Sequence, residues 1–114
     1  MTIDIKPLVK FLKQKDVKRA REWLELNRSE INAGDEFLKG YLLALQGMVS
    51  ALESGGELSA INKVLEKKYS REQIAELIRE TRDRISQKFR PEDEHGFDTA
   101  WIDVLNELSG EKKS

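Results

Sequence analysis

The sequence predicts an all-α fold, and three observations carry this prediction. The stretch 35–54 has apolar side chains around most of a helical circumference, which is typical of a helix buried among neighbours. Amphipathic patterns with capping signals cover most of the remaining chain. No segment alternates polar and apolar residues over a useful length, as a half-buried strand would. We therefore expect one domain over residues 1–110, a bundle or helical-hairpin array of five to six helices, with a frayed polar C-terminus at 111–114.

Composition narrows the class of protein without giving its function. The chain has 114 residues, of which 39% are hydrophobic and 36% charged, so a lean core should lie under a densely charged surface. A formal net charge of −1 gives no support to a generic nucleic-acid binder. The absence of cysteine excludes disulfides, thiol catalysis and thiolate metal sites. With no visible signal peptide and no stretch of about 20 apolar residues, we expect a cytoplasmic protein with no membrane association.

The first half of the chain predicts three helices, at about 5–14, 17–32 and 35–54. Asp4 is a plausible N-cap of the first helix, and Pro7 lies in its first turn, where proline is tolerated. Asp16 and Asp35 have the residue type expected at the N-caps of the next two helices. Gly34 suits the left-handed position that ends a helix. Because this turn is short, the second and third helices should form an antiparallel hairpin.

The second half predicts three more helices, at about 58–67, 71–89 and 99–108. Ser70 followed three residues later by Gln73 is the signature of a capping box. Pro91 interrupts the helical pattern, and we expect residues 90–97 to form an acidic loop. The last helix would then be capped by Asp98 or Thr99. Short similarities between helix junctions are too few to assign a repeat.

The central helix carries a line of small residues at spacings of four, three and four, namely Gly40, Ala44, Gly47 and Ala51. Each glycine in a helix interior costs about 0.5–1 kcal/mol relative to alanine. Close approach of another backbone would offset this cost. The line therefore predicts either a crossing with another helix of the same chain or a self-complementary dimer seam. Leu43 is an apolar residue beside the polar strip of the same helix.

Candidate catalytic and metal-binding residues do not form a convincing constellation. The single histidine, His95, lies among acidic residues, but their spacing matches no EF-hand loop. Glu72, Glu76 and Glu80, with Asp83, resemble the magnesium-binding carboxylates of four-helix nucleotide pyrophosphohydrolases in spacing alone. Arginines alternate with these acids, which is typical of a solvated face. Nucleophile elbows and phosphate-binding glycine loops are absent from the sequence, so we predict no catalytic residue, no metal and no cofactor.

Charge is unevenly distributed along the chain. Residues 1–28 hold eight Lys or Arg against four acids, whereas residues 92–107 hold six acids and no Lys or Arg. The simplest interpretation is that the two ends face each other, within one chain or across a dimer. An alternative is that the basic helices bind nucleic-acid phosphates through Lys6, Lys10, Lys13, Lys15, Lys18, Arg19 and Arg21.

The leading hypothesis is a small non-enzymatic protein-interaction module that binds a protein partner or itself, with a homodimer expected. Its interface would comprise the small-residue line and the apolar residues of the last helix, which are Gly40, Ala44, Gly47, Ala51, Phe97, Trp101 and Leu105. Nucleic-acid binding is the alternative, and a metal-dependent nucleotide phosphohydrolase is the third hypothesis. The partner and the pathway cannot be inferred from the sequence.

Overall fold

The structure, a computed structural model, describes residues 4–32, 36–54, 60–65, 69–86 and 91–109. These residues form six helices and no strand. The helices are α1 (Lys6–Lys13), α2 (Val17–Asn32), α3 (Glu36–Ser54), α4 (Ala60–Leu65), α5 (Arg71–Ile85) and α6 (Glu92–Ser109). The all-α prediction is confirmed. The frayed C-terminus predicted at 111–114, the Asp35 cap and the Gly34 turn lie outside the described residues.

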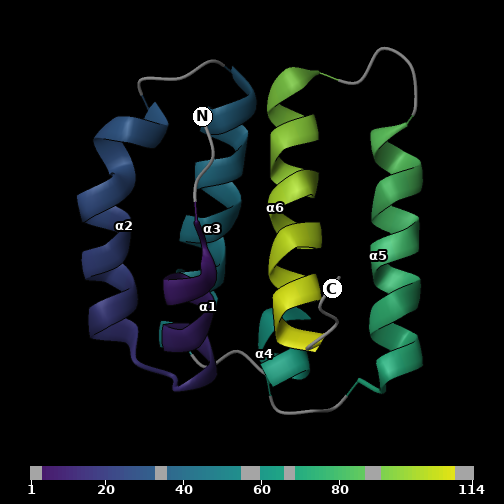
Figure 1. Ribbon diagram of the computed structural model, residues 1–114, viewed down its shortest axis with the longest axis horizontal. Helices are drawn as coiled ribbons and strands as arrows, with labels where there is room; N and C mark the ends of the chain where they lie inside the picture. Colours follow the sequence, from purple (N-terminus) through teal and green to yellow (C-terminus); the bar gives the residue numbers. More distant parts are fainter. Residues whose placement is uncertain (1–3, 33–35, 55–59, 66–68, 87–90, 110–114) are drawn as a thin grey trace.

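The helices form two antiparallel hairpins that lie side by side (Figure 1). One hairpin is α2–α3, the other is α5–α6, and α3 and α6 lie next to each other in the middle and run in the same direction. The short helices α1 and α4 each precede one hairpin. Contacts between the two halves are reciprocal in one respect, because α1 contacts α6 of the other hairpin and α4 contacts α3.

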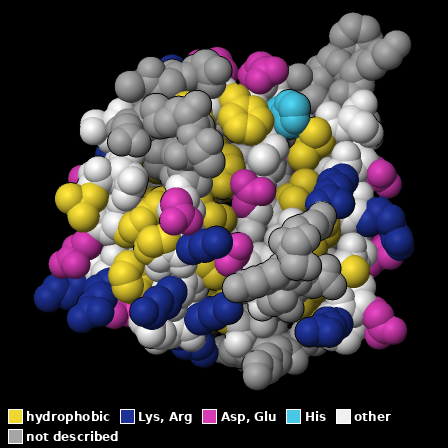
Figure 2. Space-filling view, viewed as in Figure 1, with side chains coloured by type: hydrophobic (Ala, Val, Ile, Leu, Met, Phe, Trp, Pro, Cys, Tyr) yellow, Lys and Arg dark blue, Asp and Glu magenta, His cyan; other side chains and the backbone are white. Residues whose placement is uncertain are grey.

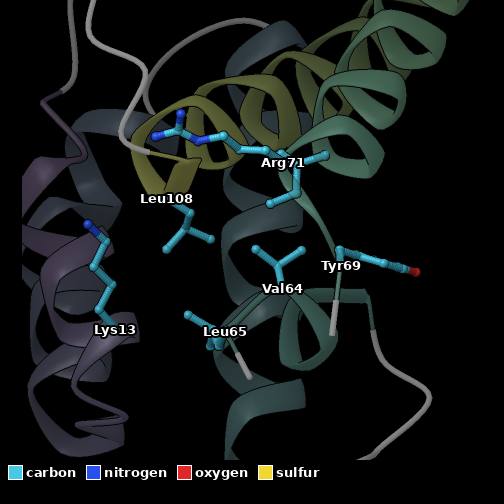
Figure 3. A pocket seen from close by; sticks show the side chains of 7 residues that line it. Lys13, Val64, Leu65, Tyr69, Arg71 and Leu108 are labelled. Carbon is cyan, nitrogen blue, oxygen red and sulfur yellow. The ribbon is translucent and has the colours of Figure 1, made fainter. Parts of the chain in front are cut away.

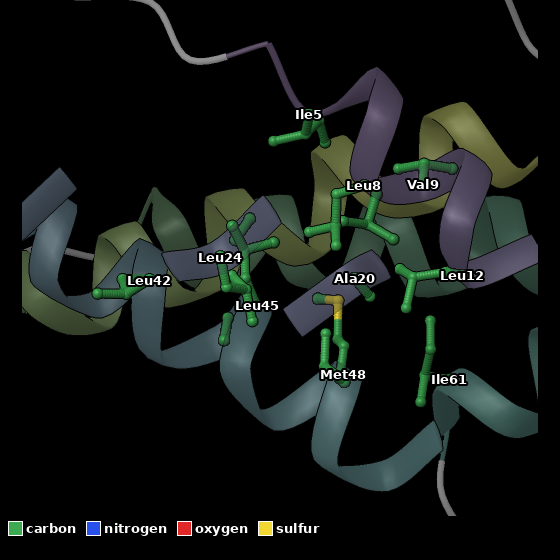
Figure 4. Packing of buried hydrophobic residues seen from close by; sticks show 14 of the residues in the cluster. Ile5, Leu8, Val9, Leu12, Ala20, Leu24, Leu42, Leu45, Met48 and Ile61 are labelled. Carbon is green, nitrogen blue, oxygen red and sulfur yellow. The ribbon is translucent and has the colours of Figure 1, made fainter. Parts of the chain in front are cut away.

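The main hydrophobic core is built on α3, as its sequence predicts. Leu45, Met48 and Val49 are at most 1% exposed. Figure 4 shows Leu45 and Met48 among apolar side chains of the surrounding helices. Burial of each such side chain stabilises the fold by about 1.5–3 kcal/mol. A second cluster joins α4, α5 and α6 through Val64, Ile74, Ile78, Ile102 and Leu105.

Two helix backbones approach each other closely at the crossing of α3 and α6. A methyl group added to Gly40 would collide with the carbonyl group of Asp93 on α6. A methyl group added to Gly96 would collide in the same way with the carbonyl group of Phe37 on α3. Each glycine therefore contacts the residue that lies three positions before the other glycine. This reciprocal geometry is that of a two-fold axis between α3 and α6, parallel to both helices.

The order of the helices and several residue identities follow the same two-fold relation and indicate an internal structural repeat. Alignment of Gly40 with Gly96 also places identical residues together at Glu36 and Glu92, Ala44 and Ala100, and Leu52 and Leu108. Ala44 and Ala100 are both at most 1% exposed. In sequence order, each half consists of a short helix and a helical hairpin. The sequence analysis assigned no repeat, because so few positions are identical.

Local interactions in α2 and α5 also correspond, but the equivalent residues there are 54 positions apart (Asp16 and Ser70) rather than 56 as for Gly40 and Gly96. The side chain of Asp16 accepts a hydrogen bond from the backbone N–H of Arg19 at the start of α2, at 3.1 Å. At the start of α5, Ser70 Oγ accepts one from Gln73 N at 3.1 Å, and Gln73 Oε1 accepts one from Ser70 N at 2.7 Å. The predicted capping box and the predicted Asp16 cap are thus confirmed. Further along the two helices, Asn27 donates to the Trp23 carbonyl and Thr81 to the Leu77 carbonyl, each at 2.8 Å.

The predicted acidic loop at 90–97 is wrong for the residues that the structure describes, because α6 begins at Glu92. Neither Asp98 nor Thr99 caps the helix; both lie inside it. Two physical reasons explain the helix. Glu92, Asp93 and Glu94 occupy its first turn, where the helix dipole favours negative charge. Gly96, which resembles a loop residue in the sequence, is required in the helix by the close approach of α3.

Other helix boundaries differ from prediction by small amounts. Helix α1 is one residue shorter at each end than expected. The N-cap of α1 is Ile5 rather than the predicted Asp4, although Asp4 accepts a hydrogen bond from the backbone N–H of Lys6, at 3.1 Å. Helix α5 ends at Ile85, with Ser86 as its C-cap, where the pattern predicted continuation to residue 89. The bounds of α2 agree with the prediction.

Candidate interaction surface

The crossing of α3 and α6 has two sides, and we call the side that contains Tyr41 the closed side. Tyr41 is 6% exposed, and its hydroxyl donates a hydrogen bond of 2.7 Å to Asp103 Oδ2 of α6. Burial raises the pKa of Tyr41 above its ordinary value of 10.0, and the hydrogen bond to Asp103 and the charge of that carboxylate raise it further. Burial also raises the pKa of Asp103, while the hydrogen bond from Tyr41 acts in the opposite direction.

Aromatic side chains complete the closed side. Phe37 lies next to Tyr41, with 6.4 Å between the ring centroids. Its ring also meets the imidazole of His95 edge-on, with 5.3 Å between centroids and 78° between planes. This geometry is favourable for aromatic pairs. His95 is therefore half-buried against an aromatic ring at the crossing, rather than in the predicted acidic loop.

We call the other side of the crossing the open side, and it is built from the equivalent positions. The repeat aligns Tyr41 with Phe97 and Asp103 with Gly47. Phe97 has no hydroxyl and is 36% exposed. Gly47 has no side chain, and among the described residues no atom outside its own part of α3 lies within 4 Å of an added methyl group. Leu43, one helical turn before Gly47, is 59% exposed. A hollow of about 330 Å³ lies here, lined by Glu36, Lys39, Gly40, Leu43, Asp93, Glu94 and Phe97.

The open side is apolar at its centre and acidic at its rim. Leu43 and Phe97 supply the apolar surface. Three carboxylates and one lysine surround them, and this lysine, Lys39, is 3.2 Å from Glu36 Oε2. The hollow is thus bordered by an excess of negative charge. Phe97 also lines a second, smaller hollow of about 190 Å³ between α5 and α6, so apolar surface is accessible on two sides of its ring.

The structure separates the predicted interface residues into two groups. Gly40, Ala44 and Leu105 are buried inside the chain, and Ala51 and Trp101 are half-buried against its cores. Gly47 and Phe97 are exposed. The line of small residues is therefore not one continuous surface. Gly40 lies at a crossing with another helix of the same chain, which is the first of the two interpretations of the sequence. Among the four residues of the line, Gly47 is the one that faces outward.

Sequence analysis did not include Leu43 in the candidate interface, although its position beside the polar strip of α3 was a signal. An apolar residue on a polar strip indicates an exposed hydrophobic side chain once the helix is packed. The equivalence of Leu43 and Thr99 of α6 is apparent only from the repeat, and the repeat is revealed by the backbone geometry.

All seven residues of the predicted basic surface are exposed, namely Lys6, Lys10, Lys13, Lys15, Lys18, Arg19 and Arg21. Figure 2 shows Lys and Arg side chains gathered at the lower left of the molecule, where α1 and the start of α2 lie. Arg21 forms an ion pair with Glu53 of α3, and Arg19 Nε lies 3.6 Å from Asp16 Oδ2. Such exposed pairs contribute little stability, typically about 0–1 kcal/mol.

The structure does not bring the candidate metal ligands together. Glu72, Glu76, Glu80 and Asp83 are all exposed, and Glu76 pairs with Arg79. The inward carboxylate cluster of a phosphohydrolase is thus not formed on α5. Within the described part of the chain, no group of three or more His, Cys, Asp or Glu residues could hold a metal ion.

Comparisons with known proteins do not place the chain in a family. No protein-family model, curated protein or solved structure matches it. Among the described helices, none has the length and apolar character needed to cross a membrane. The functional argument therefore depends on the geometry of the chain itself.

Proposed function

We propose that this chain is a non-enzymatic protein-interaction module that binds its partner on the open side of the α3–α6 crossing. The exposed interior glycine Gly47 is the observation that carries the proposal. Gly40 and Gly96 offset their helical cost through a close contact of two backbones. Gly47 has the same cost, about 0.5–1 kcal/mol, without such a contact inside the described chain. A partner backbone that packs on Gly47, Leu43 and Phe97 would supply it.

The charge around the hollow selects the type of partner. In a two-fold dimer through this surface, the acidic rim of Glu36, Asp93 and Glu94 would face the acidic rim of the second copy, and like charges at an interface are unfavourable. A helix with an apolar stripe flanked by Lys or Arg is complementary to both the centre and the rim. We therefore assign the open side to a basic amphipathic helix of another protein. The earlier prediction of a homodimer remains an alternative for experiment.

Synthetic helical peptides test this assignment. One peptide carries a leucine stripe flanked by lysines, and its counterpart has glutamates at the lysine positions. We expect saturable binding of the basic peptide, with amide shifts in NMR spectra confined to Leu43, Gly47, Phe97 and their neighbours, and no binding of the acidic peptide. Leu43→Lys should abolish binding, because it adds a charge to the apolar centre and repels the peptide.

Leu26→Lys is the matched control, since Leu26 of α2 is 82% exposed and does not line the open side. This variant should bind the peptide as the natural chain does. Equal loss of binding in both variants, or equal binding of the acidic peptide, would contradict the proposed surface. Light scattering of the chain alone tests self-association: a dimer that Leu43→Lys dissociates and Leu26→Lys preserves would assign the open side to a second copy.

Nucleic-acid binding remains a second candidate because of the exposed lysines of α1 and α2. Lys6, Lys10 and Lys18 are exposed, and no ion pair within the described residues engages them. Phosphate contacts by these residues would give an affinity for DNA or RNA that decreases steeply with salt. The double variant Lys6→Glu/Lys10→Glu should then abolish binding of a labelled oligonucleotide at low salt. Unchanged binding in this variant would exclude the basic surface.

A further inference from the structure

A larger hollow lies far from the open side, where α1, α4, α5 and the end of α6 meet. Its volume is about 620 Å³, within the range of about 300–1,000 Å³ typical of small-molecule sites. Val64, Leu65, Ile74 and Leu108 supply apolar lining, and Tyr69, Lys13 and Arg71 complete it. In Figure 3, the side chains of Val64, Leu65 and Leu108 lie between those of Lys13 and Tyr69.

The charges that border this hollow are positive. Lys13 approaches from α1, and the guanidinium end of Arg71 extends across the hollow toward the side on which Lys13 lies (Figure 3). A third cation is close by, because Lys63 Nζ lies 6.0 Å from the centroid of the Tyr69 ring. Among the described lining residues there is no acid. Glu72 on α5 is next to Arg71 in the sequence, is exposed and does not line the hollow.

The position of Arg71 is unusual for a helix. It is the first residue of α5, where the helix dipole is positive and favours acidic side chains. A cation at this position is unfavourable unless an anion lies close to it. A ligand with an anionic group between Lys13 and Arg71 would interact favourably with both side chains and with the start of the helix.

We infer that this hollow binds an organic anion with an apolar body, of the class of medium-chain fatty acids. The alkyl chain lies on Val64, Leu65, Ile74 and Leu108, and the carboxylate lies between Lys13 and Arg71. A ligand of this class needs a hollow of this size, an apolar floor and a cationic rim, and this hollow has all three. The site is independent of the proposed partner surface, because the two share no lining residue.

Three probes of equal chain length test the inference by titration, monitored through the methyl NMR signals of Val64, Leu65 and Leu108. They are decanoate, decanol and decylamine. We expect decanoate to bind saturably, decanol at least tenfold more weakly, and decylamine not at all. In Lys13→Glu/Arg71→Glu, decanoate affinity should decrease at least tenfold. Both side chains are exposed, so the variant should fold normally, and circular dichroism checks this.

Lys18→Glu/Arg79→Glu is the matched control, because it makes the same change in net charge at exposed residues outside the hollow. Decanoate affinity should be unchanged in it. An equal decrease in both double variants would show a general charge effect and overturn the inference. Equal affinity for decanol and decanoate, or no binding of decanoate, would also overturn it. Sedimentation with phosphatidylglycerol vesicles, without saturable binding of free decanoate, would assign the cations to a lipid surface instead.

Discussion

The closed and open sides of the α3–α6 crossing have equivalent backbone positions, but their side chains differ in burial. On the closed side, Tyr41 is 6% exposed and donates a hydrogen bond to Asp103. On the open side, the equivalent residues are Phe97, which is 36% exposed, and Gly47, where an added methyl group would meet no other helix in the described part of the chain within 4 Å. One side is filled by the chain's own aromatic and polar side chains. The other presents apolar surface around a hollow.

This difference shows how a repeated backbone can separate stability from binding. The shared element is the pair Gly40 and Gly96, which holds α3 and α6 together on both sides of the two-fold axis. Side chains then decide which side is closed. The closed side has a cost, since the carboxylate of Asp103 is partly removed from water and its pKa is raised. The open side avoids this cost and exposes Leu43 and Phe97 instead.

The largest predicted effect is on the shared crossing. Gly40→Ala and Gly96→Ala should each lower the free energy of unfolding by about 3 kcal/mol or more, because the new methyl group would collide with a backbone carbonyl on the other helix. Gly47→Ala is the matched control within α3. It should raise the free energy of unfolding by about 0.5–1 kcal/mol, since its methyl group would collide with no residue that the structure describes. Denaturant unfolding followed by circular dichroism measures all three.

A result in which the three alanine variants have equal stability would contradict the two-fold crossing. It would mean that α3 and α6 are not in backbone contact at Gly40 and Gly96.

The next largest effect is on the closed side. Tyr41→Phe should lower the free energy of unfolding by about 1–3 kcal/mol, because Asp103 would lose its hydrogen-bond donor while remaining partly buried. Asp103→Asn keeps an acceptor for the Tyr41 hydroxyl and removes the buried charge, so it should cost far less at neutral pH. Denaturant unfolding at pH 7 distinguishes them. If Asp103→Asn proved as destabilising as Tyr41→Phe, the negative charge of Asp103 would be stabilising, contrary to its raised pKa.

The raised pKa of Tyr41 makes the free energy of unfolding depend on pH. A raised pKa in the folded chain means that the phenol stays protonated there while the unfolded chain ionises above its ordinary value of 10.0. Tyr41 therefore contributes its full stability below pH 10, and this contribution decreases as pH rises above that value, by up to about 1.4 kcal/mol per pH unit. Thermal unfolding between pH 9 and 11 should show a smaller decline in Tyr41→Phe than in the natural chain. Parallel declines would contradict the buried phenol.

The sequence was sufficient for the fold class, the central helix and most helix boundaries, because hydrophobic periodicity and capping residues act locally. It failed where a residue serves a distant contact. Gly96, between acidic residues and after Pro91, has the features of a loop until α3 is placed against it. The basis of the repeat is likewise a pair of backbone contacts, Gly40 with Asp93 and Gly96 with Phe37, with few identical residues around them. The position of Leu43 beside the polar strip indicated its exposure, but that it lies beside Phe97 became known only from the same crossing.

The smallest effect, and the sharpest test of the comparison, comes from rebuilding the closed pair on the open side. Phe97→Tyr adds the hydroxyl and Gly47→Asp adds the carboxylate at the positions equivalent to Tyr41 and Asp103. Each single variant should change stability little, because both positions are exposed. The double variant should exceed the sum of the singles by about 0.5–1 kcal/mol in a double-mutant cycle, as one new hydrogen bond would give. It should also no longer bind the basic amphipathic peptide, since the new pair would occupy the hollow beside Leu43. Strict additivity with unchanged peptide binding would mean that the two sides are not geometric counterparts, and that Phe97 is exposed for a reason unrelated to the repeat.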